Sequence, residues 1–184
     1  MRILLIISLF CAMAMLHGQQ NTVFLTENGA VGFVSEAPLE IIKASSSSLK
    51  GAIDVEKQSF VFFLENQSFK GFNSPLQQEH FYENYLEIAK YPKTTFTGRI
   101  IEPLNIVPGT EQTVRAKGIL DLHGMKQERM IKAVLNYQEG AIKISSTFTI
   151  LLDDHHIRIP KVVSKKIASE IRVSIEAVMV PNKP

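Results

Sequence analysis

Hydrophobic and polar residues alternate along most of the chain, and this pattern is typical of β-strands that bury one face. The clearest segments are 113–122, 131–137, 142–152 and 171–179. Two short glycine-containing stretches, "HGMK" and "QEG", separate the first three of these segments. Turn residues in such positions predict an antiparallel meander whose strands are joined by hairpins.

The first third of the chain shows the same alternation in a noisier form. It predicts strands near 30–36, 38–44, 49–57 and 58–66, with a bend in "ASSSSLKG" between the second and the third. A further strand is expected after Pro92, where Thr94, Phe96 and Gly98 alternate with their neighbours. The whole chain therefore predicts an all-β fold of about eight to ten strands.

One segment changes from strand spacing to helical spacing. A helix is expected over about 75–89, with Ser74 as its N-cap and Pro75 at its first position. Phe81, Tyr85 and Ile88 share one side of this helix. That apolar side predicts packing against the sheet, either as a structural plug or as a lid over a cavity.

Proline residues mark the ends of two elements. Pro92 biases Tyr91 away from helical geometry, so the chain should turn directly from the helix into the next strand. Pro160 ends the strand before it, and a short helix is expected near 161–168.

A sheet of this size with one apolar face must fold onto itself, as a closed barrel or as a sandwich. Small residues are set among large ones on the apolar faces. If they all point inward, a barrel of about eight strands could leave space for one ligand. If they instead oppose large side chains, the interior is filled. The small residues are Ala116, Gly118, Ala133, Ser146 and Ala177.

The first eighteen residues have the features of a secretory signal peptide. Arg2 is followed by the apolar run "ILLIISLFCAMAML" and then by "HGQQ". Cleavage after Gly18 would make Gln19 the new N-terminus, and Ala14 is a second candidate site. The alternative is that this run forms a buried strand or helix. The predicted organisation is a signal peptide over 1–18 and a single domain over 19–184, in the periplasm or outside the cell.

Composition narrows the range of functions. The chain has 184 residues, of which 45% are hydrophobic and 21% charged, as in an ordinary globular domain. A formal net charge of +2 does not suggest a nucleic-acid partner. Removal of 1–18 would take away Cys11, the one cysteine of the sequence, so the remaining chain would contain no disulfide and no thiol nucleophile.

The best lead for enzymatic chemistry is "DDHH", residues 153–156. Asp and His are suitable metal ligands, but neighbouring residues on a strand point to opposite faces. A solvated strand end is the preferred interpretation. His80 and His123 have no evident catalytic partner, and Glu79, Glu83 and Glu87 are interpreted as a solvated helix face. The sequence therefore predicts no catalytic residue and no metal site; a metal-dependent hydrolase centred on 153–156 is a weaker alternative.

Several local motifs occur together in the order found in one family. They are "SFVFFLENQSFKGF" (59–72), "LQQEHFYENYLEIAKYPKTTFTGRI" (76–100), "AKGILDLHGMKQ" (116–127), "ISSTFTILLDDHHIRIP" (144–160) and "IRVSIEAVM" (171–179). With them the chain resembles the YceI-like family of exported, lipocalin-like β-barrel proteins. The most recognisable element is the aromatic helix that leads through a Tyr-Pro joint into a strand.

The resemblance implies an extended antiparallel barrel with a packed helix, in which some members hold a polyisoprenoid chain in an apolar lumen. It implies a non-enzymatic lipid-binding protein for transport or storage in the bacterial envelope, with no required cofactor and with transient membrane contact for lipid exchange. The alternative is a structural or interaction module with a filled barrel. The candidate lumen residues are Phe33, Phe60, Phe62, Phe96, Ala116, Gly118, Leu120, Ala133, Leu135, Ile144, Phe148, Ile150, Val173 and Ile175.

Overall fold

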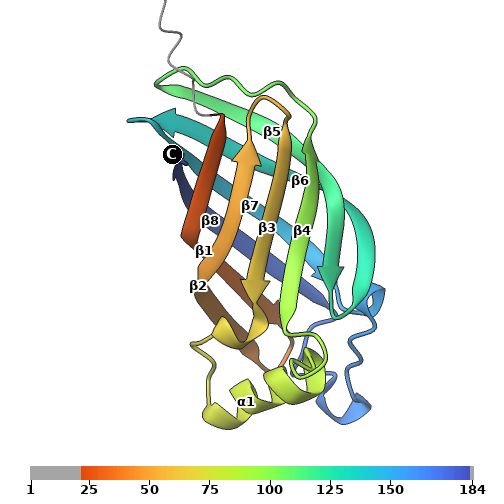
Figure 1. The fold of residues 1–184 in the computed structure, drawn as a ribbon. Helices are drawn as coiled ribbons and strands as arrows, with labels where there is room; N and C mark the ends of the chain where they lie inside the picture. Colours follow the sequence, from red (N-terminus) through yellow and green to blue (C-terminus); the bar gives the residue numbers. More distant parts are fainter. Residues whose placement is uncertain (1–21, 183–184) are drawn as a thin grey trace, which may run out of the picture.

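Eight antiparallel strands form a closed barrel in the computed structural model, which describes residues 22–182 (Figure 1). Each strand pairs with the next along the chain, and the last pairs with the first. The strands are β1 Val23–Glu36, β2 Ile41–Asp54, β3 Ser59–Glu65, β4 Lys93–Ile100, β5 Thr110–Leu122, β6 Met125–Gln138, β7 Ala141–Leu151 and β8 Glu170–Pro181. The predicted all-β barrel is confirmed, and the signal peptide predicted over 1–18 lies outside the described residues.

Pairing of β1 with β8 closes the barrel and excludes the sandwich. The register runs from Ser35 opposite Ile171 to Phe24 opposite Pro181, with one irregularity between Leu25 and Ala30. Closure pairs the two outermost strands of the sheet with each other. β6 and β7 pair only from Val134 opposite Ser145 to Gln138 opposite Ala141, so their remaining residues are not paired with each other.

The predicted break between two strands in the serine-rich segment is wrong, although a register irregularity does lie there. β2 is one continuous strand through Ser45–Ser48, where strands over 38–44 and 49–57 were expected. The Ser46 side chain points inward and is paired with the Ser68 hydroxyl at 2.7 Å. The register between β1 and β2 shifts on both sides of Gly29: the first shift has its extra residue in β1, and the second has its extra residue in β2, between Ser46 and Leu49.

The two predicted hairpin turns are confirmed. His123 and Gly124 connect β5 to β6, with φ of 54° and 71°. Glu139 and Gly140 connect β6 to β7, with φ of 52° and 78°. Positive φ at both central residues defines the type I′ turn, whose twist matches that of the flanking strands.

The helical segment is shorter than the predicted helix over 75–89, and it changes from an α-helix to a π-helix. α1 spans Pro75–His80, and a π-helical turn follows over Phe81–Tyr85, in which Leu86 N donates to Phe81 O at 2.9 Å. The predicted cap is confirmed, since Ser74 Oγ accepts from Gln77 N at 3.2 Å. The apolar side behaves as expected: Phe81, Tyr85 and Ile88 all pack against the core.

A buried asparagine holds the Tyr91-Pro92 joint after the helical segment. Asn66 follows β3 and is completely buried. Its side-chain nitrogen donates to Tyr91 O at 2.8 Å, and its backbone N donates to Pro92 O at 2.8 Å. Thr94 Oγ1 donates to Asn66 Oδ1 at 2.8 Å. These bonds fix the point at which the chain enters β4.

The helix expected near 161–168 is a single 3₁₀ turn, Lys161–Val163, followed by irregular turns. The Ser164 hydroxyl donates to Lys161 O at 2.8 Å, a local bond that competes with helix continuation. Ala168 N then donates to Ser35 Oγ at 2.9 Å, which directs the chain into β8. Within residues 22–182, no helix has the length and hydrophobicity needed to span a membrane.

Strands β4 and β5 approach closely where two glycines face each other. Gly98 pairs with Gly118 in the register of these strands. A methyl group built on Gly98 would lie 2.5 Å from Gly118 Cα, and one built on Gly118 would overlap Thr97 O. The contact therefore requires glycine at both positions.

We predict that Gly118→Ala lowers the free energy of unfolding by about 1–3 kcal/mol, because the added methyl group overpacks a backbone contact. Urea unfolding followed by circular dichroism measures this change. Gly32→Ala is the matched control, since its methyl group would meet the Ser174 hydroxyl at 3.1 Å, and that group can rotate. Equal stability of the Gly118→Ala variant and the parent protein would contradict the prediction.

Candidate functional site: an apolar cavity inside the barrel

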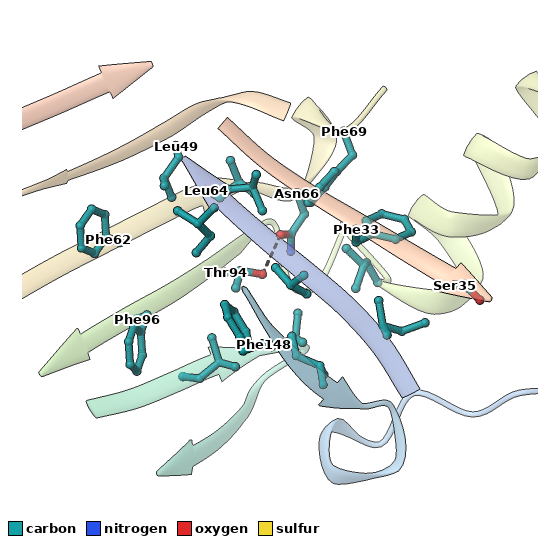
Figure 2. Close-up of a pocket in the computed structure, with 18 of the residues that line it drawn as sticks. Phe33, Ser35, Leu49, Phe62, Leu64, Asn66, Phe69, Thr94, Phe96 and Phe148 are labelled. Carbon is teal, nitrogen blue, oxygen red and sulfur yellow. Dashed lines mark hydrogen bonds between the residues drawn. The ribbon is translucent and has the colours of Figure 1, made fainter. Parts of the chain in front are cut away.

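The barrel encloses a cavity of about 520 Å³. Its wall is formed by the inward-facing side chains of β1 to β8 together with α1, the π-helical turn and the segment before β8. Figure 2 shows aromatic and aliphatic side chains from several strands converging on this space. Sites that bind small apolar ligands commonly enclose about 300–1,000 Å³. The interior is therefore hollow.

Thirteen of the fourteen candidate lumen residues lie on the cavity wall, although their role in binding a ligand stays a prediction. Gly118 is the exception, because its position is taken up by the contact with Gly98. The thirteen are Phe33, Phe60, Phe62, Phe96, Ala116, Leu120, Ala133, Leu135, Ile144, Phe148, Ile150, Val173 and Ile175.

Three phenylalanines form the deep aromatic part of the wall. The ring centroids of Phe60 and Phe96 are 4.8 Å apart, and those of Phe60 and Phe62 are 6.0 Å apart. Phe62 lies over Gly51 of β2, where a methyl group would meet the ring. Glycine thus lets the ring lie flat against the neighbouring strand, which keeps the centre of the barrel open.

A second aromatic group lies at the end of the barrel covered by α1. Phe33 stacks on Phe81 at 5.3 Å, and Phe69 and Phe72 lie 5.3 Å and 6.0 Å from Phe33. Phe69 and Phe72 were missed as cavity residues, because they follow β3 in irregular structure where no strand period applies. The one sequence signal for them was the pair of phenylalanines in "SFKGF", a segment that follows no strand or helix pattern.

The opposite end of the barrel is closed by packed side chains. Ile142 and Met179 are fully buried, pair across β7 and β8, and belong to a core cluster with Phe24. None of these three lines the cavity. Phe24 also contacts Tyr137 edge-to-face at 6.2 Å. The cavity is therefore closed at this end and reaches the α1 end.

Charged groups on the cavity wall are confined to its mouth, which lies between α1, the β1–β2 turn and the segment before β8. Glu40 accepts from Gln77 Nε2 at 2.9 Å, and His80 and Lys166 are exposed. Further inside, burial raises the pKa of Tyr85, so its hydroxyl stays neutral. Asn66 and Thr94 are bonded to each other, as the dashed line in Figure 2 shows. The wall below the mouth carries no charged side chain.

His123 links the β5–β6 hairpin to the end of the helical segment. Its Nδ1 lies 2.9 Å from His155 O, and its Nε2 lies 2.9 Å from Glu87 Oε2. The carbonyl and the carboxylate both present acceptor oxygens to the ring. A hydrogen bond from Lys90, at 2.5 Å, and one from His123 hold the pKa of Glu87 below its ordinary value. The interpretation of Glu87 as part of a solvated face is wrong.

The "DDHH" segment forms a 3₁₀ turn, Asp153–His155, instead of a strand end. Asp153, Asp154 and His156 are exposed, but His155 is completely buried, so the interpretation of the segment as solvated is wrong for His155. Its Nδ1 lies 3.3 Å from Leu122 O. In the part of the chain from 22 to 182, no three His, Cys, Asp or Glu side chains come together in a group that could hold a metal ion.

Comparison with known proteins places the chain in a family. The model of the YceI-like domain matches residues 21–179. The protein belongs to the YceI-like family. Among the curated proteins, none matches the chain.

Solved structures share the YceI-like fold at low sequence identity. One is a polyisoprenoid-binding domain from Saccharophagus degradans implicated in plant cell wall breakdown, with a TM-score of 0.73 and 14% identity, covering 89% of this chain and all of that one. Another is BcnA of Burkholderia cenocepacia, with a TM-score of 0.68 and 13% identity, covering 82% and 95% of the two chains. A third is the YceI protein of Campylobacter jejuni, with a TM-score of 0.60 and 15% identity, covering 77% and 85%.

We predict that His155 makes this YceI-like barrel less stable at acidic pH. Burial lowers the pKa of His155 below its ordinary value of 6.5. Below about pH 6.5 the unfolded chain binds this proton and the folded chain resists it, so the free energy of unfolding falls as pH falls. In the His155→Asn variant, the decline of the thermal midpoint between neutral and acidic pH should be shallower.

The control for this experiment is His156→Asn, which changes the exposed neighbour. His156 has φ of 55°, a conformation that asparagine tolerates. This control should keep the full pH dependence of the thermal midpoint. Identical pH profiles for the His155→Asn variant and the parent protein would show that another group causes the decline.

Proposed function

We propose that the protein is an exported, non-enzymatic lipid carrier that holds one long apolar chain of the isoprenoid class in its barrel. The observation that carries this proposal is the hollow interior of about 520 Å³, whose wall is apolar below a mouth that contains Glu40 and Lys166. A ligand with a long hydrocarbon part matches such a wall. A charged or strongly polar ligand would lose its hydration there without gaining partners.

Burial of hydrocarbon would supply the binding energy. Each methylene group moved from water into an apolar site contributes roughly 0.8 kcal/mol, so a long chain can bind tightly with few polar contacts. The aromatic rings of Phe60 and Phe96 offer flat, rigid surfaces to such a chain. The name of the related Saccharophagus degradans domain states that it binds polyisoprenoid, which supports this ligand class.

The alternative of a filled interaction module has less support, because small inward residues leave space that large ones do not occupy. Ala116 and Ala133 both border the cavity. Transport or storage outside the cytoplasm fits the apolar run after Arg2, and brief contact with a membrane would allow loading and release.

Native mass spectrometry of the protein purified from its own cells tests the ligand directly. We expect a retained apolar ligand that organic solvent extracts and that excess isoprenoid alcohol restores. A protein that is empty and stays empty on titration with such alcohols would refute the carrier function.

Export is tested by the N-terminus of the protein in its cells of origin. We predict that the mature chain begins at or near Gln19, since the residues before it have the features of a cleaved signal peptide. Peptide mass spectrometry of the purified protein determines this terminus. A chain that still contains Arg2 would contradict export by this route.

We also predict that Ala133→Phe removes bound lipid but preserves the fold. Ala133 borders the cavity, so the added ring would enter ligand space instead of a packed core. The thermal midpoint should hardly change, whereas overpacking of a filled core would cost about 1–3 kcal/mol. Both bound lipid and the thermal midpoint are measured on the same sample.

Met130→Phe is the matched control on the same strand, because Met130 is exposed on the outside of β6. This variant should keep both its lipid and its stability. Unchanged lipid content in the Ala133→Phe variant would show that the ligand does not occupy this part of the cavity.

A further inference from the structure

The three most exposed large hydrophobic side chains of the described residues surround the cavity mouth. Val162 is 89% exposed, Leu39 67% and Leu76 58%. We call these three residues the rim. Single exposed hydrophobic residues are common, but a group of them beside a ligand site indicates an interaction surface.

The three rim residues come from three segments at one end of the barrel: the β1–β2 turn, α1 and the segment before β8. Leu39 N donates to Lys165 O at 2.9 Å, which joins the β1–β2 turn to the segment before β8. Leu76 of α1 lines the cavity, as does Val163, the neighbour of Val162. In Figure 1 these segments lie together at the end of the barrel that carries α1.

Four basic residues accompany the rim on the segment 158–167. They are Arg158, Lys161, Lys165 and Lys166, and this segment contains no acidic residue. All four are exposed. The ion pairs of the described residues include none of them, so their charges are available to an anionic partner.

Acidic residues lie on both sides of the mouth. Glu79 and Glu83 are exposed on the helical segment, and Glu40 in the mouth is bonded to Gln77. Asp153, Asp154 and Glu170 are exposed just before and just after the segment 158–167, and Asp154 is paired with Arg129. The four unpaired basic residues are therefore concentrated on the segment 158–167, between these acidic positions. An anionic surface would approach the side formed by the segment 158–167.

We propose that the rim docks on an anionic lipid surface, with Val162 and Leu39 inserted among the lipids and the nearby lysines on headgroup phosphates. This inference rests on the proposed lipid-carrying function, since docking would place the mouth against the bilayer. An apolar chain could then pass between membrane and cavity without crossing water. A protein partner is the competing occupant, but exposed apolar side chains beside unpaired lysines at the mouth of an apolar cavity favour the lipid surface.

The apolar rim and the lysines beside it would each contribute to binding at a membrane. Apolar side chains bind by burial at the boundary between headgroups and acyl chains, and lysines add electrostatic attraction that depends on anionic lipid. The surface should therefore bind vesicles weakly when they are neutral and more strongly when they contain anionic lipid. Salt should weaken the electrostatic attraction between the lysines and the anionic lipid.

The test uses flotation of the full protein with vesicles of phosphatidylcholine alone and of phosphatidylcholine mixed with phosphatidylglycerol. We expect Val162→Asp to bind the mixed vesicles about tenfold more weakly than the parent protein. Val107→Asp is the matched control, because Val107 is 54% exposed in the loop between β4 and β5, at the opposite end of the barrel. It should bind as the parent protein does.

A second variant tests the charges. Replacing Lys161, Lys165 and Lys166 together by glutamine should weaken binding to the mixed vesicles by about a hundredfold and leave binding to neutral vesicles nearly unchanged. All of these positions are exposed, so folding should be preserved. Circular dichroism and the thermal midpoint confirm the fold of each variant.

The outcomes separate docking from ligand binding. Equal flotation of the Val162→Asp and Val107→Asp variants, or no flotation of the parent protein, overturns the docking proposal even if bound lipid is found by mass spectrometry. Loss of flotation with retained bound lipid in the Val162→Asp variant supports it. An empty protein that takes up no isoprenoid refutes the carrier function, whatever the flotation result.

Discussion

Closure of β8 onto β1 is the constraint on which the rest of the structure depends. With eight strands the ring has a fixed width, and the side chains that point inward decide whether its interior is filled or hollow. Here many inward positions are small, among them Ala116, Ala133 and Ala177. Gly51 and Gly98 let rings and strands lie close to the wall. The cavity therefore follows from ring size together with residue size, and neither would produce it alone.

The two ends of the hollow barrel are covered in different ways. At one end Ile142, Met179 and Phe24 pack into a core cluster that closes the interior. At the other end α1 and the π-helical turn cover the opening, and several polar contacts tie this cover to the barrel, among them two near its C-terminal end. Asn66 bonds the backbone of the Tyr91-Pro92 joint, and His123 contacts Glu87 just before it. The mouth lies between this cover, the β1–β2 turn and the segment before β8, where Gln77 of α1 donates to Glu40.

Alternation by two was enough to predict the all-β fold, the two glycine turns and most of the residues of the cavity wall, because these features depend on local spacing. It left a barrel and a sandwich equally open, and the family resemblance was needed to predict the barrel. Alternation was not enough for the serine segment of β2, where the strand continues through an extra residue between Ser46 and Leu49. The π-helical turn at Phe81 and the burial of His155 also depend on tertiary packing. Phe69 and Phe72 reach the cavity from irregular structure, where side-chain direction has no period to reveal it.

The two ends of the hollow barrel differ in charge and in access to solvent. The apolar wall extends inward from a mouth that contains Glu40 and Lys166, and the far end is closed, so a bound apolar chain would enter and leave at the mouth. A chain that leaves by this route into water would expose its whole hydrocarbon surface, at a cost that grows with each methylene group. The same burial that would retain the ligand would therefore oppose its release into solvent. A carrier of this kind needs an apolar surface at its mouth, and Val162, Leu39 and Leu76 are the exposed side chains that supply one.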